Sequence, residues 1–203
     1  MSIASQFIAR MYELPPGTHR SKIIGKIDIR AADGTRLLTD LYEPRGDGPF
    51  PTLLMRTPYG RRGFAMVAEI YAERGYRLIL QACRGTDGSG GTFDPLVNER
   101  DDGLATLEWI KSQQWFDGRL GLVGPSYLGY AQWAICDVLP PGAAISAKCT
   151  AADFEQIVFP GGAFHLQLWL SWLQTVHGLE TQMFGMTLRM VTGDVERRTE
   201  KVG

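Results

Sequence analysis

The sequence predicts an α/β protein built on a mostly parallel sheet. Three short apolar runs, Thr52–Arg56, Tyr76–Ala82 and Leu120–Val123, have the length and composition of buried strands. Stretches that suit helices separate these runs, and strands joined through helices form right-handed crossovers in a parallel sheet covered on both faces. Ligands of such sheets bind beyond the carboxyl ends of the strands, so we expect a functional site in the loops that follow these runs.

The first fifth of the chain predicts an antiparallel start to this sheet. Apolar residues from Phe7 to Met11 fall at helical spacing, and Pro15 and Pro16 end any helix there. Two alternating runs follow, Ile23–Arg30 and Thr35–Tyr42, and Asp33-Gly34 between them suits a tight hairpin. A packing helix and a hairpin are therefore expected before the first parallel strand.

The rest of the chain alternates between helical and strand-like patterns. Gly75 closes the first helical run, and a glycine-rich loop, Cys83–Asp94, follows the second buried strand. The predicted helices lie at Phe64–Gly75, Leu104–Gln113, Tyr130–Leu139 and Pro160–Gly178, and a further strand lies at Ala144–Thr150.

The segment GLVGPSYLG, residues 121–129, predicts a sharp turn from a strand into a helix with Ser126 at its apex. Such a turn points the apical side chain out of the sheet and places the first N–H groups of the helix beside it. Gly124 and Gly129 suit the turn because side chains there would clash where strand and helix pass closely. A nucleophilic serine is one interpretation, and a serine that only caps the helix is the other.

Composition excludes several classes of function. The chain has 203 residues, is 44% hydrophobic and 21% charged, and carries a formal net charge of −1, so it offers no basic field for nucleic acid. Its three cysteines show no CxxC spacing, which favours neither a disulfide framework nor a zinc site. No run resembles a signal peptide or a membrane span. We expect a cytoplasmic protein without a metal or cofactor.

Two loops should lie on the same edge of the sheet as Ser126. The first, Arg56–Gly63, carries Tyr59, whose hydroxyl could donate to a developing oxyanion or simply pack in the loop. The second, Cys83–Asp94, lacks the GxxxxGK[ST] pattern of a phosphate-binding loop, so nucleotide binding is not expected. We predict that Arg84 and Asp87 pair within this second loop.

Taken together, RTPYGR, QACRGTDGSGG and LATLEWIKSQQWFDGRLGLVGPSYLGYAQW resemble the N-terminal part of the CocE/NonD hydrolase family. That family includes cocaine esterase, α-amino acid ester hydrolases and X-prolyl dipeptidyl-peptidases, and the resemblance spans roughly residues 23–172. It implies an α/β-hydrolase fold in which Ser126 is the nucleophile. It also implies an oxyanion hole formed by the Tyr59 hydroxyl and the Tyr127 N–H. Ala82 departs from the family, where an acidic residue often follows the glutamine.

The resemblance implies hydrolysis of an ester or amide substrate through an acyl-enzyme, which requires a histidine base oriented by an acid. The family's aspartate and histidine lie downstream of a helical cap. Of the histidines in this chain, His19 precedes the sheet, and His165 and His177 fall on the predicted cap helix, where each is a minor candidate for the base. Asp153 occupies a possible acid position, although the resemblance indicates a structural role for it.

Residues 1–155 are expected to form the N-terminal part of the hydrolase domain, and residues 156–203 to begin the cap. The chain is interpreted as the N-terminal part of a longer enzyme. The alternative is a complete protein that needs a second chain or a homo-oligomer, or that acts as a non-catalytic interaction module.

The substrate stays open between esters or amides, which we favour, and X-Pro peptides. A dipeptidyl-peptidase needs an acidic group for the substrate amine, and Glu155 and Glu180 are candidates by location. Trp169 and Trp172 could line an aromatic acyl pocket, although their helical spacing also suits a core role.

Overall fold

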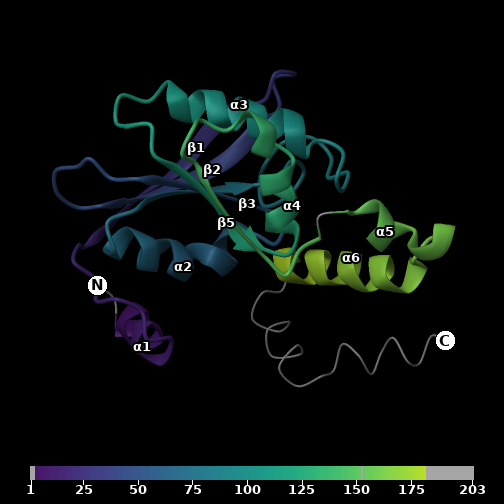
Figure 1. Cartoon of the computed structure of the whole chain (residues 1–203), viewed down its shortest axis with the longest axis horizontal. Coiled ribbons are helices and arrows are strands. Elements are labelled where there is room, and N and C mark those ends of the chain that lie inside the picture. The colour runs from purple at the N-terminus through teal and green to yellow at the C-terminus, as the bar shows by residue number, and fades with distance from the viewer. Residues whose placement is uncertain (1–2, 152, 182–203) are drawn as a thin grey trace. The chain divides into compact units, whose positions relative to one another are not determined.

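The computed structural model describes residues 3–151 and 153–181 of the chain (Figure 1). It divides into two units, Met1–Thr150 and Ala151–Gly203. The predicted sheet lies in the first unit and the predicted cap helix in the second.

In the described part of the first unit, six strands form one sheet in the order β1-β2-β4-β3-β5-β6. β3 pairs in parallel with both β4 and β5, and β5 pairs in parallel with β6. The hairpin of β1 and β2 adds to β4 in antiparallel orientation. The predicted α/β class, with a mostly parallel sheet and an antiparallel N-terminal hairpin, is confirmed. The strands are β1 Ser21–Arg30, β2 Arg36–Pro44, β3 Thr52–Thr57, β4 Arg77–Ala82, β5 Leu120–Pro125 and β6 Ala144–Lys148.

Helices cover both faces of this sheet. Figure 1 shows α2 on one face and α3 on the other, with α4 beside β5. α4 also contacts β3 and β6, and α1 contacts α2. The helices of the first unit are α1 Ile3–Met11, α2 Arg61–Glu73, α3 Glu99–Lys111 and α4 Tyr127–Trp133, with a 3-10 turn at Cys136–Val138.

Alternating side chains of the buried strands build two cores, one on each face. Leu53 and Met55 of β3 pack with Ala68 and Ala72 of α2, whereas Leu54 packs with Leu107 of α3. This alternation explains why β3 and β4 are continuous apolar runs, because a strand covered on both faces buries every side chain.

The helix after Ser126 differs from its prediction. It begins at Tyr127, three residues earlier than expected, and ends at Trp133 rather than Leu139. The backbone leaves the helical region at Ile135, whose φ is −127°. The fully buried side chain of Ile135 packs in the core on the α3 face, so the break in the helix accompanies the burial of this residue.

The second unit contains α5 (Glu155–Val158), a 3-10 turn at Pro160–Gly162, and α6 (Leu166–Thr181). α6 overlaps the predicted cap helix but begins at Leu166 rather than Pro160, because the 3-10 turn at Pro160–Gly162 leaves the helical region at Gly161. In α6 the rings of Trp169 and Trp172 meet edge-on at 5.3 Å. The rest of the predicted beginning of the cap, residues 182–203, lies outside the described residues. Among the helices that the structure describes, none combines the length and apolarity that a bilayer span requires.

Candidate active site

Ser126 occupies the sharp turn between β5 and α4. Its φ of 57° and ψ of −126° lie in a region that residues other than glycine rarely adopt. Its N–H donates to the carbonyl of Lys148 at 2.8 Å, and its own carbonyl accepts from the Gly129 N–H at 2.8 Å. Its side chain makes no capping bond to α4, so the interpretation that this serine caps the helix is wrong. The turn has the strained geometry of a nucleophile elbow.

The two glycines flanking the turn are required by close packing, as their spacing predicts. A Cβ at Gly124, whose φ is +142°, would lie 2.5 Å from the Cβ of Leu128. A Cβ at Gly129 would lie 2.6 Å from Cγ2 of Thr150. Real Cβ atoms do not approach so closely, so any other residue would clash with the start of α4 at Gly124 and with the segment that follows β6 at Gly129.

The structure brings Tyr59 to Ser126. The Tyr59 hydroxyl lies 3.1 Å from Ser126 Oγ, within hydrogen-bonding distance. The loop that carries Tyr59 is held at its start, because the Tyr59 N–H donates to Thr57 Oγ1 at 3.1 Å. The alternative in which Tyr59 only packs in its loop does not account for this contact.

The loop is also held at its far end, through Arg61. The Arg61 N–H donates to Asp87 at 2.7 Å and its guanidinium donates to Asp40 at 2.8 Å.

The predicted pairing of Arg84 with Asp87 is wrong. Arg84 instead donates two hydrogen bonds to Asp102 in α3 and one to Asp33 of the hairpin. Arg84 and Asp87 belong to the same loop but bind different elements: Arg84 binds α3 and the hairpin, and Asp87 binds the start of α2. Local sequence spacing could not show this.

Tyr127 follows the serine, and its side chain points into the protein. Its hydroxyl donates to Glu99 Oε1 at 2.9 Å and accepts from the Leu96 N–H at 2.9 Å. Burial, together with the negative charge of Glu99, raises the pKa of Tyr127 far above its ordinary value. Glu99 in turn pairs with Arg56, whose Nη2 lies 2.8 Å from Oε2. Sequence reasoning missed this pair, although an arginine closing the apolar run TLLMR was a usable signal.

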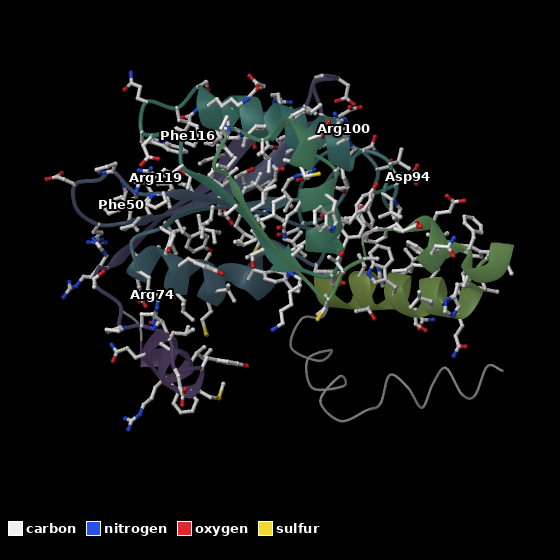
Figure 2. All side chains as sticks on the ribbon, in the orientation of Figure 1. Phe50, Arg74, Asp94, Arg100, Phe116 and Arg119 are labelled. Carbon is white, nitrogen blue, oxygen red and sulfur yellow. The ribbon has the colours of Figure 1, made fainter. Side chains whose placement is uncertain are left out.

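The candidate bases and acid fall in separate places. His19 lies against Phe50, just before β3, at 5.3 Å between ring centroids. Figure 2 labels Phe50 and Arg119 at the end of the sheet where β3 and β5 begin, and Arg119 donates to the neighbouring Pro49 carbonyl at 3.2 Å. His19 is therefore at the opposite end of the strands from Ser126.

The remaining candidates lie in the second unit. His165 immediately precedes α6 rather than lying on it, and His177 is within α6. Asp153 accepts from the Gln156 N–H at 3.3 Å at the start of α5, a local structural bond. Glu155 opens α5, while the side chain of Glu180 is outside those the structure describes.

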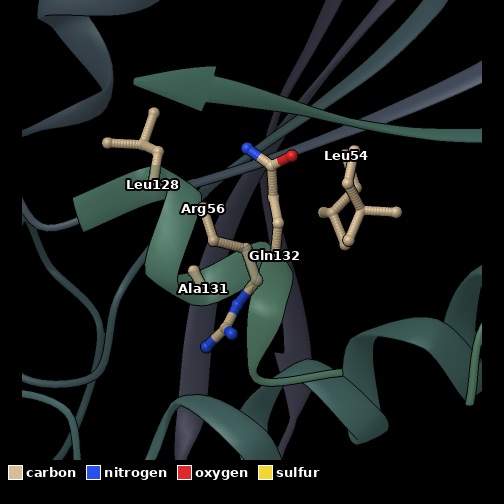
Figure 3. Close-up of a pocket in the computed structure, with 6 residues that line it drawn as sticks. Leu54, Arg56, Leu128, Ala131 and Gln132 are labelled. Atoms are coloured by element: carbon tan, nitrogen blue, oxygen red, sulfur yellow. The ribbon is translucent and has the colours of Figure 1, made fainter. Parts of the chain in front are cut away.

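A small cavity lies behind the elbow, between β3, β5 and α4 (Figure 3). Its volume of about 10 Å³ is far below that of a substrate pocket. Gln132 crosses it and donates to the Gly124 carbonyl at 3.0 Å, while Figure 3 shows the Arg56 guanidinium pointing the other way. The cavity therefore belongs to the support of the elbow rather than to substrate binding.

Comparison with known proteins decides the family. The sequence pattern of the family described as X-Pro dipeptidyl-peptidase (S15 family) matches residues 33–198, most of the chain. The chain belongs to this S15 family. The chain is also 36% identical over 159 residues to the cocaine esterase of Rhodococcus sp. (strain MB1 Bresler), covering 74% of this chain and 28% of the esterase. The resemblance to CocE/NonD hydrolases is thereby confirmed.

Solved structures agree on the fold of this S15 chain. A CocE/NonD family hydrolase from Staphylococcus aureus matches 79% of the chain and 33% of its own length, with a TM-score of 0.66 and 23% identity. An aminopeptidase from a marine sediment Thaumarchaeota archaeon matches 73% of the chain and 28% of its own length, with a TM-score of 0.60 and 22% identity. The chain thus spans a third or less of the length of these relatives.

Proposed function

We propose that this chain carries the nucleophile and the oxyanion hole of a serine hydrolase that cleaves esters or amides through an acyl-enzyme. The observation that carries the proposal is the hydroxyl of Tyr59 at 3.1 Å from Oγ of a serine held in a strained elbow. Membership in the S15 family and 36% identity to a cocaine esterase support it. The substrate is a small ester or amide, and the reaction uses no cofactor.

In the proposed reaction, Ser126 Oγ attacks the carbonyl carbon, and the carbonyl oxygen becomes an oxyanion. The Tyr59 hydroxyl and the Tyr127 N–H donate to that oxygen. Collapse of the tetrahedral intermediate expels the alcohol or amine, and water then releases the acid and restores the serine. The Oγ proton must pass to a base, for which His165, His177 or a histidine of a longer protein or partner chain are the candidates.

The first test is the intact mass of the chain after treatment with a fluorophosphonate, whose fluoride an activated serine displaces. We expect one adduct on the folded wild-type chain and none on Ser126→Ala. Ser89, which lies in the neighbouring loop and donates to the Ala82 carbonyl at 3.0 Å, provides a matched control, and Ser89→Ala should still be labelled. A folded wild-type chain that takes no label would contradict the proposal for this chain.

Within this function, the family description favours a second candidate, cleavage after an X-Pro pair. We retain the ester or amide preference, since a relative that is 36% identical over 159 residues is a cocaine esterase. Initial rates on a p-nitrophenyl ester should exceed those on an X-Pro-p-nitroanilide at equal concentration, and both should vanish in Ser126→Ala. A higher rate on the anilide would reverse the order of the two candidates.

A further inference from the structure

Both donors of the proposed oxyanion hole connect to one buried ion pair. Arg56 and Glu99 are 3% and 2% exposed, and burying such charges is costly unless they are paired and hydrogen-bonded. Arg56 also donates through Nη1 to the main-chain carbonyl of Glu99 at 2.7 Å and through Nε to Gln81 at 3.0 Å. The pair therefore joins β3, β4 and the first residue of α3 into one rigid unit.

On one side, the pair reaches the backbone beside the nucleophile. Glu99 accepts from the Tyr127 hydroxyl at 2.9 Å, and the ring of Tyr127 is fixed against Phe93 and Tyr130, with 5.8 Å between centroids in each case. A tyrosine side chain has only two rotatable bonds. When its hydroxyl is hydrogen-bonded and its ring is packed on both sides, the positions of its Cα and its N–H are therefore also restricted. The direction of the Tyr127 N–H is thereby set from inside the protein.

On the other side, the pair reaches the Tyr59 hydroxyl through β3. Arg56 lies three residues before Tyr59, and between them Thr57 is fully buried, accepts the Tyr59 N–H at 3.1 Å, and accepts the Cys83 N–H at its carbonyl at 2.9 Å. Pro58 limits the remaining backbone freedom. The segment from the guanidinium to the phenol of Tyr59 therefore has little room to move.

We propose that Arg56 and Glu99 are positioning residues that fix the separation of the two oxyanion donors, the Tyr59 hydroxyl and the Tyr127 N–H. The proposal rests on the function proposed above. Oxyanion donors act by being fixed before the charge develops, and small displacements of such groups are costly in rate. A pair that only stabilised the fold would hold the sheet and α3 together without affecting the chemical step in folded molecules.

Tyr127→Phe tests the link to Glu99, and Tyr130→Phe is its matched control. The Tyr130 hydroxyl donates to the Leu96 carbonyl at 2.7 Å, and the Tyr127 hydroxyl accepts from the Leu96 N–H at 2.9 Å. Each variant therefore removes one hydrogen bond to Leu96. Tyr130, however, lies one helical turn further from Ser126. Intact-mass labelling with a fluorophosphonate gives the limiting rate, the inhibitor concentration at half that rate, and the fraction labelled. Loss of folding lowers the fraction labelled, whereas displacement of a donor lowers the limiting rate.

We expect Tyr127→Phe to lower the limiting rate about tenfold at an unchanged half-saturating concentration, and Tyr130→Phe to stay within about twofold of wild type. Glu99→Gln, which keeps an acceptor for Tyr127 but removes the charge facing Arg56, should also lower the limiting rate of its folded fraction. Equal rates for Tyr127→Phe and Tyr130→Phe would overturn the proposal, as would a Glu99→Gln variant that labels at the wild-type rate.

A second measurement separates failure of this proposal from failure of the proposed function. If the wild-type chain takes no label, the proposed activity fails for it, and amide spectra of ¹⁵N-leucine protein then decide the positioning role. The Leu96 amide reports loss of its bond to Tyr127, and the Leu128 amide reports the backbone beside Tyr127. We expect both signals to shift in Tyr127→Phe, with Leu128 unmoved in Tyr130→Phe. An unmoved Leu128 signal in Tyr127→Phe would overturn the positioning role.

Discussion

Ser126 has a strained backbone, which lowers the stability of the fold, and a hydroxyl that contacts Tyr59. Its backbone lies at φ 57° and ψ −126°, where a side chain is strained, and its Oγ meets the Tyr59 hydroxyl at 3.1 Å. A glycine would relieve the strain but would remove the hydroxyl. A strained residue that the surrounding structure holds in place is typical of a functional position rather than of a structural turn.

The strain at Ser126 should be measurable as stability. Ser126→Gly and Ser126→Ala both remove Oγ, so both end its contact with Tyr59, and they differ in the backbone freedom of residue 126. We expect the glycine variant to be more stable than the alanine variant by about 1 kcal/mol, since relief of about 1–3 kcal/mol of strain exceeds the entropic cost of glycine of about 0.5–1 kcal/mol. Urea unfolding of the two variants gives the difference. An alanine variant equal to or more stable than the glycine variant would show that the turn is not strained.

Helices and strands could be predicted largely from local pattern. The apolar runs at β3, β4 and β5 and the hairpin of β1 and β2 were all predicted, because burial on both faces and turn residues leave direct marks in the sequence. Gly124 and Gly129 indicated the elbow for a similar reason, since a side chain would clash with Leu128 of α4 at the first position and with Thr150, after β6, at the second. The helix after the elbow was misplaced because its break at Ile135 depends on the α3 core and not on its own composition.

Contacts between elements could not be predicted from sequence spacing. Insertion of β4 between β2 and β3 sets which residues share an edge, and no local pattern encodes that order. Arg84 was expected to pair three residues away, yet its partner Asp102 is in α3. Glu99 and Arg56 lie 43 residues apart and meet only because α3 begins beside the end of β3. The proximity of Ser126 and Tyr59 at one edge of the sheet was thus predictable, whereas the buried groups behind them were not.

The first unit as a whole buries several tyrosine side chains wholly or in part, and this should govern its response to alkali. Burial raises the pKa of Tyr127 and, to a lesser degree, those of Tyr71 and Tyr130. Burial, with the negative charges of Asp40 and Glu69, also raises the pKa of Tyr42 to about 12, compared with about 10 in an unfolded chain. In each case the folded protein retains a proton that the unfolded chain would release.

The free energy of unfolding should therefore fall as the pH rises from about 10 to 12. Over that interval the unfolded chain binds fewer protons than the folded protein, so stability decreases by up to about 1.4 kcal/mol per pH unit for each such tyrosine. Below pH 10 this contribution is fully present. Urea unfolding at intervals between pH 8 and 12 measures the slope. Tyr42→Phe should make it shallower, whereas Tyr12→Phe, which alters a side chain that is 66% exposed, should not. Equal slopes for these two variants would show that the burial of Tyr42 does not contribute to alkaline unfolding.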